Sequence, residues 1–284
     1  MKSQYHRGVL IPAIAFTLFT FVLTLSATSS EAINGGVPDN YEHPNVGLMG
    51  VFWDGEPVGA CTATLIDKQV VLTAAHCIEN ALTFGTFPEE VTVMVSFDED
   101  PVSDPGAAEW RDVTALIPHP DYSWRPNSNP YDIGLLLLAE EVEDIPPATL
   151  PEKGLLTALK KAGELNHGND KTSFTVVGFG ITLDWPSPAY DLLPQPRQQV
   201  ESGYRSLLKV WLHLSQNPAT EDGGSCFGDS GGPVFWEDGE GNETIVGITS
   251  WGDPHCVSPS FNYRVDLEES LDFIASYLDG EPAE

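Results

Sequence analysis

The sequence predicts an all-β protein assembled from many short strands. Its 284 residues include 41% apolar residues, enough to form a sizeable buried core, and this excludes a wholly disordered chain. The 26 Gly and 23 Pro residues end strands and form turns, so they disfavour a helical bundle. Length alone allows one large domain or two small ones.

The chain is strongly acidic, with 13 Lys and Arg against 42 Asp and Glu and a formal net charge of −29. Such a charge repels phosphate, so nucleic acid is the least favoured partner, and anionic membrane surfaces are disfavoured for the same reason. A soluble, self-repelling surface explains the charge most simply. Adaptation to salt and steering of cationic substrates are the alternatives.

The first 32 residues have the pattern of a secretory signal peptide. Two basic residues precede an almost wholly apolar run at 9–25, and a stretch of small residues follows it. A run of about 17 residues is marginal for a membrane span, which leaves an uncleaved anchor as the weaker alternative. Small residues at Ser30 and Ala32 favour cleavage after Ala32. We therefore expect a secreted, extracellular domain over 33–284 with no stable membrane span, a periplasm or cell envelope being the other destinations.

Short apolar runs separated by Gly, Pro, Asn and Asp predict the strands, and their density is typical of an all-β sandwich or barrel. In one run Leu208, Val210, Leu212 and Leu214 alternate with other side chains, which is the two-residue period of a strand. The predicted strands are 46–52, 63–66, 70–73, 91–97, 113–117, 133–138, 174–177, 207–214, 233–236 and 244–250.

The end of the chain has a different period. Leu267, Leu271, Ile274 and Leu278 are spaced by four, three and four residues, which predicts a helix over 266–279 with one apolar stripe. Acidic residues in its first turn suit the helix dipole. We expect this helix to pack on the core and to carry no chemistry.

Two acidic, proline-containing stretches, 98–112 and 184–197, are expected to be surface loops. The first gathers four carboxylates within seven positions, and oxygen ligands cluster in this way around calcium. Neither their spacing nor a glycine matches a defined calcium loop, so a solvated acidic loop is the favoured interpretation.

Three segments carry residues suited to nucleophilic catalysis. Ser230 lies in the glycine-rich segment 223–233, where its hydroxyl can be unshielded and neighbouring N–H groups can converge on an oxyanion. His76 ends a strand-to-turn segment of small residues, and Asp132 opens a strongly apolar strand. An Asp at such a position is costly unless it is paired, and a histidine N–H is a suitable partner.

These segments, together with 61–66 and 250–252, resemble the chymotrypsin/trypsin-like serine protease family. The chain order His, Asp, Ser matches that family and differs from those of subtilisins and α/β-hydrolases. The resemblance extends over 33–278. It implies two six-stranded antiparallel β-barrels with the active site in the cleft between them, followed by a C-terminal helix. The implied parts are barrel halves at 33–140 and 141–265 and a helix at 266–279.

The resemblance also implies a serine endopeptidase that acts on proteins or peptides, with a protein inhibitor as a further partner. Ser230 would be the nucleophile, His76 the general base, and Asp132 the group that fixes the histidine tautomer. The backbone N–H groups of Gly228 and Ser230 would form the oxyanion hole. No cofactor is expected, and no metal, because no pair of histidines has zinc-ligand spacing.

Export would expose four cysteines to an oxidising compartment, where they could pair in three ways, and the spacing alone does not choose among them. The resemblance implies the disulfides Cys61–Cys77 and Cys226–Cys256. The first would hold the histidine turn to a neighbouring strand. The second would tie the serine loop to the segment that contains Trp251.

The resemblance implies an activation step as well. In this family a newly formed N-terminal amine pairs with the Asp that precedes the catalytic serine, here Asp229. The sequence that begins at Ile33 is similar to the usual start. No Arg or Lys precedes Ile33, so we hypothesise that signal cleavage after Ala32 creates the amine directly.

The family's primary specificity pocket (S1) maps onto Gly224, Ser225, Ser250, Trp251, Gly252 and Ser260. Trypsin-like relatives have an Asp six positions before the nucleophile, and this chain has Gly224 there. We therefore expect a neutral pocket that takes uncharged P1 residues, bulky apolar or aromatic ones. Asp253 and His255 near the rim leave contact with a basic group as an alternative.

Two other functions remain open at this point. One is a non-catalytic binding or regulatory protein on the same scaffold, which the presence of His76, Asp132 and Ser230 disfavours. The other is a protease or esterase with one narrow target, since a fold alone does not determine substrate range.

Overall fold

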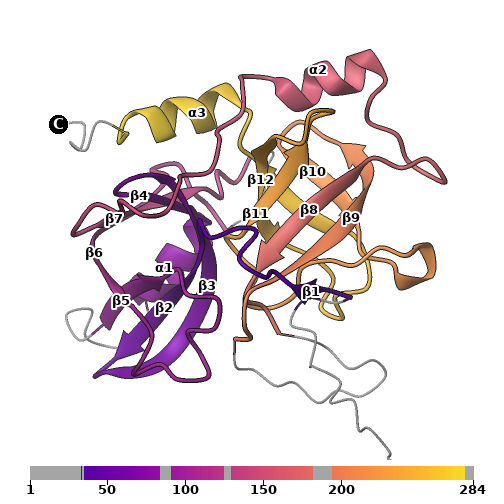
Figure 1. Ribbon diagram of the computed structural model, residues 1–284. Coiled ribbons are helices and arrows are strands. Elements are labelled where there is room, and N and C mark those ends of the chain that lie inside the picture. The colour runs from indigo at the N-terminus through magenta and orange to yellow at the C-terminus, as the bar shows by residue number, and fades with distance from the viewer. Residues whose placement is uncertain (1–32, 34, 84–90, 125–128, 182–193, 279–284) are drawn as a thin grey trace, which may run out of the picture.

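The computed structural model describes residues 33, 35–83, 91–124, 129–181 and 194–278. It contains two closed six-stranded antiparallel barrels that lie side by side (Figure 1). The expected all-β fold of two barrels with a C-terminal helix is therefore confirmed. The candidate signal peptide lies outside the described residues. None of the helices in the described ranges combines the length and apolar character that a membrane crossing requires.

The first barrel closes in the order β2-β3-β4-β7-β6-β5, with β5 pairing back onto β2. Its interior is filled by apolar side chains such as Leu65, Leu72 and Leu135, which are wholly buried. Its strands are β2 (Val46–Trp53), β3 (Glu56–Asp67), β4 (Val70–Thr73), β5 (Val91–Ser96), β6 (Arg111–Pro118) and β7 (Gly134–Leu138).

The second barrel runs β9-β10-β13-β12-β11-β8 and closes through the pairing of β8 with β9. The short strand β1 (Val37–Pro38) extends the edge of β9, which joins the N-terminal segment to this barrel. The strands are β8 (Ser173–Gly178), β9 (Gln198–Leu207), β10 (Trp211–Ser215), β11 (Pro233–Glu237), β12 (Glu243–Trp251) and β13 (Ser260–Arg264).

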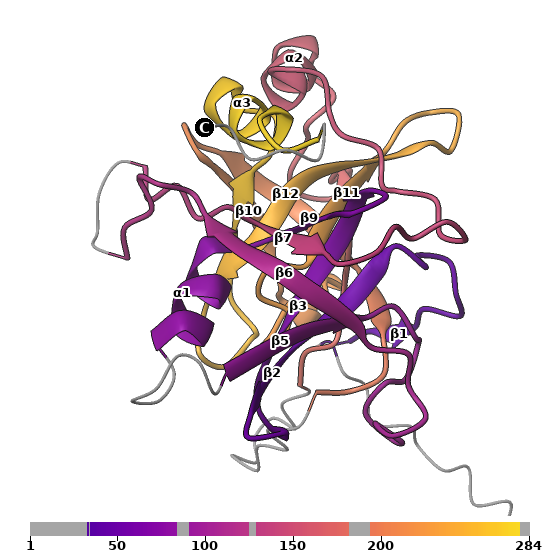
Figure 2. The ribbon, with the colours of Figure 1, turned by 90° about the vertical axis from the view of Figure 1, so that its left-hand side faces the viewer.

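In the described ranges the barrels are accompanied by three α-helices, α1 (Ala75–Thr83), α2 (Leu155–Ala162) and α3 (Glu268–Ala275). Figures 1 and 2 show α2 and α3 at the same end of the molecule. From the end of β13, α3 returns towards the first barrel, where Phe273 packs on the ring of His119 with centroids 4.8 Å apart. The expected helix at 266–279 is thus present, in a shorter form.

The predicted strand 207–214 is wrong as one element. β9 ends at Leu207 and β10 begins at Trp211, and the N–H of Leu208 donates to the carbonyl of Trp211 at 2.9 Å to close the turn. The alternation of Leu and other residues continues across this turn, so the sequence pattern did not reveal it. Most of β9 was missed as well, because Gln, Glu and Ser dilute its apolar residues.

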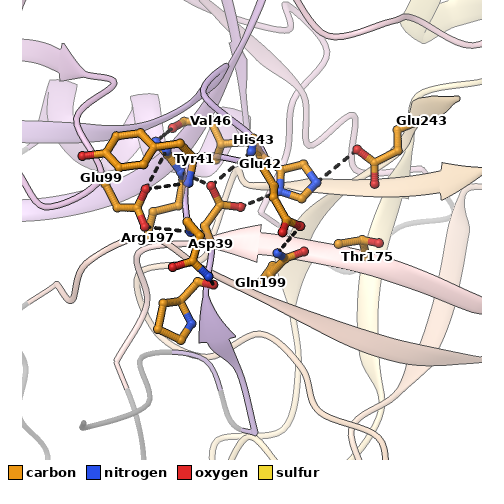
Figure 3. A network of polar contacts seen from close by, with 12 residues as sticks. Asp39, Tyr41, Glu42, His43, Val46, Glu99, Thr175, Arg197, Gln199 and Glu243 are labelled. Carbon is orange, nitrogen blue, oxygen red and sulfur yellow. Dashed lines mark hydrogen bonds and ion pairs between the residues drawn. The ribbon is translucent and has the colours of Figure 1, made fainter. Parts of the chain in front are cut away.

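A buried polar network joins the N-terminal segment to both barrels (Figure 3). Arg197, which precedes β9, is wholly buried and donates to Asp39 at 2.8 Å. It also donates to the carbonyls of Val46 and Phe97, both at 3.0 Å, and lies 3.5 Å from a carboxylate oxygen of Glu99. The expectation that 184–197 is a surface loop is therefore wrong at Arg197, whose charge is matched by these oxygens. Residues 182–193 lie outside the described ranges.

In the other expected acidic loop, 98–112, two of the carboxylates accept local hydrogen bonds and Glu99 makes long-range ones. Asp98 accepts the N–H of Glu109 at 2.8 Å, and Asp100 accepts those of Val102 and Ser103 at 3.3 and 3.0 Å. The interpretation of a solvated loop therefore does not hold at Glu99, whose carboxylate accepts the N–H groups of Asn40 and Tyr41 at 2.8 Å and lies beside the buried Arg197.

His43 completes the network between the barrels. Its Nδ1 lies 2.5 Å from Asp39, and its Nε2 lies 3.1 Å from Glu243 on β12. Burial lowers the pKa of His43, but the hydrogen bonds and charges of Asp39 and Glu243 outweigh burial and raise that pKa to about 9. At neutral pH the ring is therefore a cation held between two carboxylates, and this holds the N-terminal segment against the second barrel.

We expect this ion pair to make folding stability depend on alkaline pH. Because the pKa is raised from 6.5 to about 9 in the folded chain, the contribution is full below about pH 6.5 and is lost as pH rises through about 9. The difference between these two pKa values corresponds to a contribution of about 3 kcal/mol to the free energy of unfolding. Denaturant unfolding at about pH 6 and about pH 10 should show this loss in the wild-type protein and not in His43→Gln.

The exposed His167→Gln serves as the matched control and should behave as wild type. An equal loss of stability in wild type and His43→Gln across this pH range would contradict the assignment of the loss to the charge on His43.

Candidate active site

Strand register brings His76 and Asp132 to the same edge of the first barrel. Thr73, the last residue of β4, pairs with Gly134, the first residue of β7. His76 follows Thr73 by three residues and Asp132 precedes Gly134 by two, so both side chains emerge beside each other. Gly134 permits this approach, because a Cβ there would lie 2.6 Å from Cδ1 of Ile78 in α1.

Asp132 holds the histidine through two hydrogen bonds. Its Oδ2 accepts from Nδ1 of His76 at 2.9 Å, and its Oδ1 accepts the backbone N–H of His76, also at 2.9 Å. The Ser250 hydroxyl donates to Oδ2 as well. These contacts fix the ring orientation and assign the Nδ1 proton, which leaves Nε2 free to accept a proton.

The two groups shift each other's pKa in opposite directions. Burial lowers the pKa of His76, but the charge and hydrogen bond of Asp132 outweigh it, so the His76 pKa lies above its ordinary value of 6.5. Burial raises the pKa of Asp132, and His76 together with the Ser250 hydroxyl reverses that effect, so the Asp132 pKa lies below 3.8. Asp132 is therefore ionised at neutral pH, and it stabilises a positive charge on the ring.

Ser230 stands on a tight turn that Asp229 organises. The wholly buried Asp229 carboxylate accepts the N–H of Cys226 and the N–H of Gly180, both at 2.7 Å. Gly228 has φ of +100°, a conformation that strains other residues, and a Cβ there would lie 3.0 Å from Cα of Gly180. Among the described residues, the N–H groups of Gly228 and Ser230 donate to no acceptor, so both are free to bind an oxyanion.

Thr62 of β3 carries contacts from the first barrel to this turn. Its N–H donates to the carbonyl of Ser230 at 2.8 Å, and its hydroxyl donates to the carbonyl of Gly228 at 2.9 Å. The same hydroxyl accepts the N–H of Phe179 at 3.2 Å. Thr62 thus holds the Gly228–Asp229 and Ser230–Gly231 peptides. No role for Thr62 was expected from the sequence, since its partners lie far away in the chain.

One sulfur atom lies close to both His76 and Ser230. Cys77 Sγ lies 3.6 Å from Nε2 of His76 and 3.6 Å from the carbonyl oxygen of Ser230. In the part of the chain that the structure describes, no hydrogen bond joins the Ser230 hydroxyl to His76. Catalytic hydrogen bonds of this kind are often long without substrate and shorten when it binds.

The disulfides are Cys61–Cys77 and Cys226–Cys256, the pairing that the resemblance implies. Cys61, Cys77 and His76 offer ligand atoms within 4.8 Å of one another. The two sulfur atoms are already bonded to each other, so they provide no thiolate for a metal.

The six residues assigned to the specificity pocket differ in exposure. Ser225, Ser250 and Ser260 are buried, whereas Trp251 is 51% exposed and its ring stacks on Phe261 with centroids 3.6 Å apart. The sequence analysis missed one further side chain here, that of Gln216, which lies against Gly224. Nothing in the chain spacing pointed to Gln216, because it follows β10 and reaches this place only through the fold.

Asp253, considered as a contact for a basic group, is engaged within its own loop. Its Oδ2 accepts the N–H groups of His255 and Val257, both at 3.2 Å. Ile33 is part of the continuous chain, so its nitrogen is a peptide N–H, which donates to Gln198 Oε1 at 3.3 Å, and its side chain is wholly buried; the activation pair stays a prediction. Burial raises the pKa of Asp229 to about 7 despite the two backbone donors.

An apolar hollow of about 890 Å³ lies beside the oxyanion turn. Phe227 and Gly228 contribute to its lining, and residues of the first barrel form most of it. Those residues include Leu48, Phe52, Val58, Met94 and Trp110.

Comparison with known proteins places the chain in one family. Residues 41–274 match the family profile described as Trypsin. The chain is 31% identical to mouse (Mus musculus) ovochymase-2 over 210 residues, which are 68% of this chain and 30% of that protein. It is 28% identical to CLIP domain-containing serine protease B15 of Anopheles gambiae over 243 residues, 78% of this chain and 64% of that protein.

It is also 28% identical to chymotrypsin-like elastase family member 1 of dog (Canis lupus familiaris) over 229 residues, 79% of this chain and 82% of that protein. The chain spans less than two thirds of the length of the first two relatives. The family match covers both barrels, the histidine turn, the Asp132 strand and the serine loop. This chain belongs to the trypsin family of serine proteases.

Proposed function

We propose that this chain is an extracellular serine endopeptidase with Ser230 as nucleophile. The observation that carries the proposal is the pairing of His76 with Asp132 beside a turn whose two N–H groups, at Gly228 and Ser230, have no acceptor among the described residues. These are the base, its orienting carboxylate and the oxyanion donors that acyl transfer requires.

In the proposed reaction, the Ser230 hydroxyl oxygen attacks the carbonyl carbon of the scissile peptide bond while Nε2 of His76 takes its proton. The N–H groups of Gly228 and Ser230 donate to the oxygen that becomes negative. Asp132 stabilises the imidazolium that forms. His76 then gives the proton to the leaving amine, which leaves an acyl group on Ser230, and water activated by His76 removes it.

Substitution of single members of the triad tests this mechanism. Ser230→Ala and His76→Ala should each lower kcat/KM on short chromogenic peptides and on a denatured protein by about 10⁴-fold or more, because the residues act as one unit. Circular dichroism should show both variants folded. Peptide hydrolysis that persists in Ser230→Ala would refute the assignment. Hydrolysis of small esters alone would favour the narrow-target esterase.

The raised pKa of His76 predicts the acid limb of the activity profile. Activity requires a neutral ring, so kcat/KM should fall as pH drops through a pKa that lies above 6.5. In Asp132→Asn the carboxylate no longer favours the protonated ring. The limb should therefore move to lower pH, while kcat falls by about 10⁴-fold. If kcat/KM of Asp132→Asn falls at the same pH as that of wild type, Asp132 does not raise the pKa of His76.

We also propose that a free amine at Ile33 completes the site by pairing with Asp229. Ile33 is wholly buried in the second barrel's apolar cluster, and Gly35 lies against Gly223, whose segment leads into the serine loop. The described residues give the Asp229 carboxylate no cation, which is why burial dominates its pKa. An ammonium group in contact with Asp229 would lower that pKa and hold the turn in place.

A chain that begins at Ile33 should therefore be compared with one that keeps Ala32 as an extra residue. Without the amine, the raised pKa of Asp229 costs stability as pH rises from about 4 to about 7. The chain beginning at Ile33 should be the more stable at pH about 7 and about 10²-fold more active, since a misplaced turn loses an oxyanion donor. Equal activity of the two chains would refute the pairing. In Asp229→Asn the stability difference should vanish.

A further inference from the structure

A carboxamide from outside the serine loop lies against Gly224 and near Gly252, two of the residues assigned to the specificity pocket. Gln216 directly follows β10 and is 1% exposed. A Cβ on Gly224 would lie 2.3 Å from Cγ and 2.5 Å from Nε2 of Gln216. The Gln216 side chain therefore takes the volume that a side chain at position 224 would occupy, and Gly224 is required there.

The hydrogen bonds of Gln216 determine which way its amide faces. Its Nε2 donates to the carbonyl of Ser225 at 2.5 Å and to the hydroxyl of Ser225 at 3.2 Å. A backbone carbonyl only accepts, so the atom facing it is the nitrogen and the opposite atom is the oxygen. Both N–H groups are thereby engaged, and the nitrogen has no donor left for another molecule.

The oxygen of Gln216 is buried without a partner. Among the described residues no group donates to Oε1, and this atom lies 3.7 Å from the position of a Cβ on Gly252. The amide thus extends between the Gly224–Ser225 side of the pocket and the Gly252 side. Buried acceptors in folded proteins are nearly always satisfied, so an unpaired one in a binding pocket indicates a donor that arrives with the ligand.

We propose that Gln216 determines substrate specificity, with Oε1 accepting a hydrogen bond from a neutral N–H or O–H donor at the tip of the P1 side chain. The inference rests on the proposed function, because that function makes Gly224, Ser225 and Gly252 the walls of the P1 pocket. Glutamine and tyrosine are such residues. The expectation of a bulky apolar P1 residue did not take Gln216 into account.

A cationic P1 residue is disfavoured at this position. Oε1 is a neutral acceptor, and one neutral hydrogen bond does not replace the hydration of an ammonium or guanidinium group. Asp253, the carboxylate considered at the rim, accepts two backbone N–H groups of its own loop. The pocket therefore selects for a donor without selecting for positive charge.

Peptides that differ only at P1, in pairs matched for size, test the proposal. The wild-type protein should show kcat/KM about tenfold higher for Gln than for Met and for Tyr than for Phe, because the apolar partner leaves Oε1 unpaired. In Gln216→Met, which keeps the volume and removes the acceptor, both ratios should fall to about one. Gln69→Met, in the first barrel, is the matched control and should keep the wild-type ratios.

Gln216→Glu provides a second variant. Its carboxylate should raise kcat/KM for the peptide with P1 Lys relative to that for the peptide with P1 Gln. Wild-type ratios near one in both pairs would overturn the proposal, as would ratios that Gln216→Met leaves unchanged. Either result with active protein refutes the role of Gln216 and leaves the peptidase assignment intact.

Binding to Ser230→Ala, measured by calorimetry with the same peptides, separates the two proposals. Tighter binding of the Gln and Tyr peptides, lost when Gln216→Met is added, supports the pocket assignment even if wild-type protein hydrolyses nothing, in which case the peptidase proposal alone falls. Absence of both hydrolysis and binding for every peptide overturns both.

Discussion

The Asp229 carboxylate is wholly buried, and the catalytic arrangement depends on where it is held. Its two oxygens accept N–H groups from Cys226, before the turn, and from Gly180, in the neighbouring loop. A buried carboxylate without such donors would be strongly unfavourable, so these bonds dictate the path of the chain between them. Along that path Gly228 has a positive φ, and the N–H groups of Gly228 and Ser230 have no acceptor within the described part of the chain.

Contacts between the barrels position this turn against the base. Thr62 in β3 holds the carbonyls on both sides of Asp229, while the pairing of β4 with β7 places His76 beside Asp132. His76, the proposed base, therefore belongs to one barrel, and Ser230, the proposed nucleophile, belongs to the other. Their relative position depends on the barrel interface, and the network of Arg197, Asp39 and His43 ties the N-terminal segment to the same interface (Figure 3).

Short sequence segments predicted those strands and site residues whose signal lies within the segment itself. The segments around His76, Asp132 and Ser230 could be found in the sequence because each has an unusual composition of glycine, small residues or an Asp before an apolar strand. Arg197 and Gln216 could not be found, because their partners are distant in the chain and neither lies in a motif. The turn at 208–210 was missed because apolar alternation runs through it without Gly, Pro or Asn.

Covalent labelling tests the central claim most directly, since it asks whether one serine is activated by one histidine. Protein beginning at Ile33 would be treated with a fluorophosphonate, digested and analysed by mass spectrometry. The account predicts a single phosphonylated residue, Ser230, with labelling slowed strongly in His76→Ala. Labelling of Ser230 at the same rate in His76→Ala, or no labelling of Ser230 in folded wild-type protein, would contradict it.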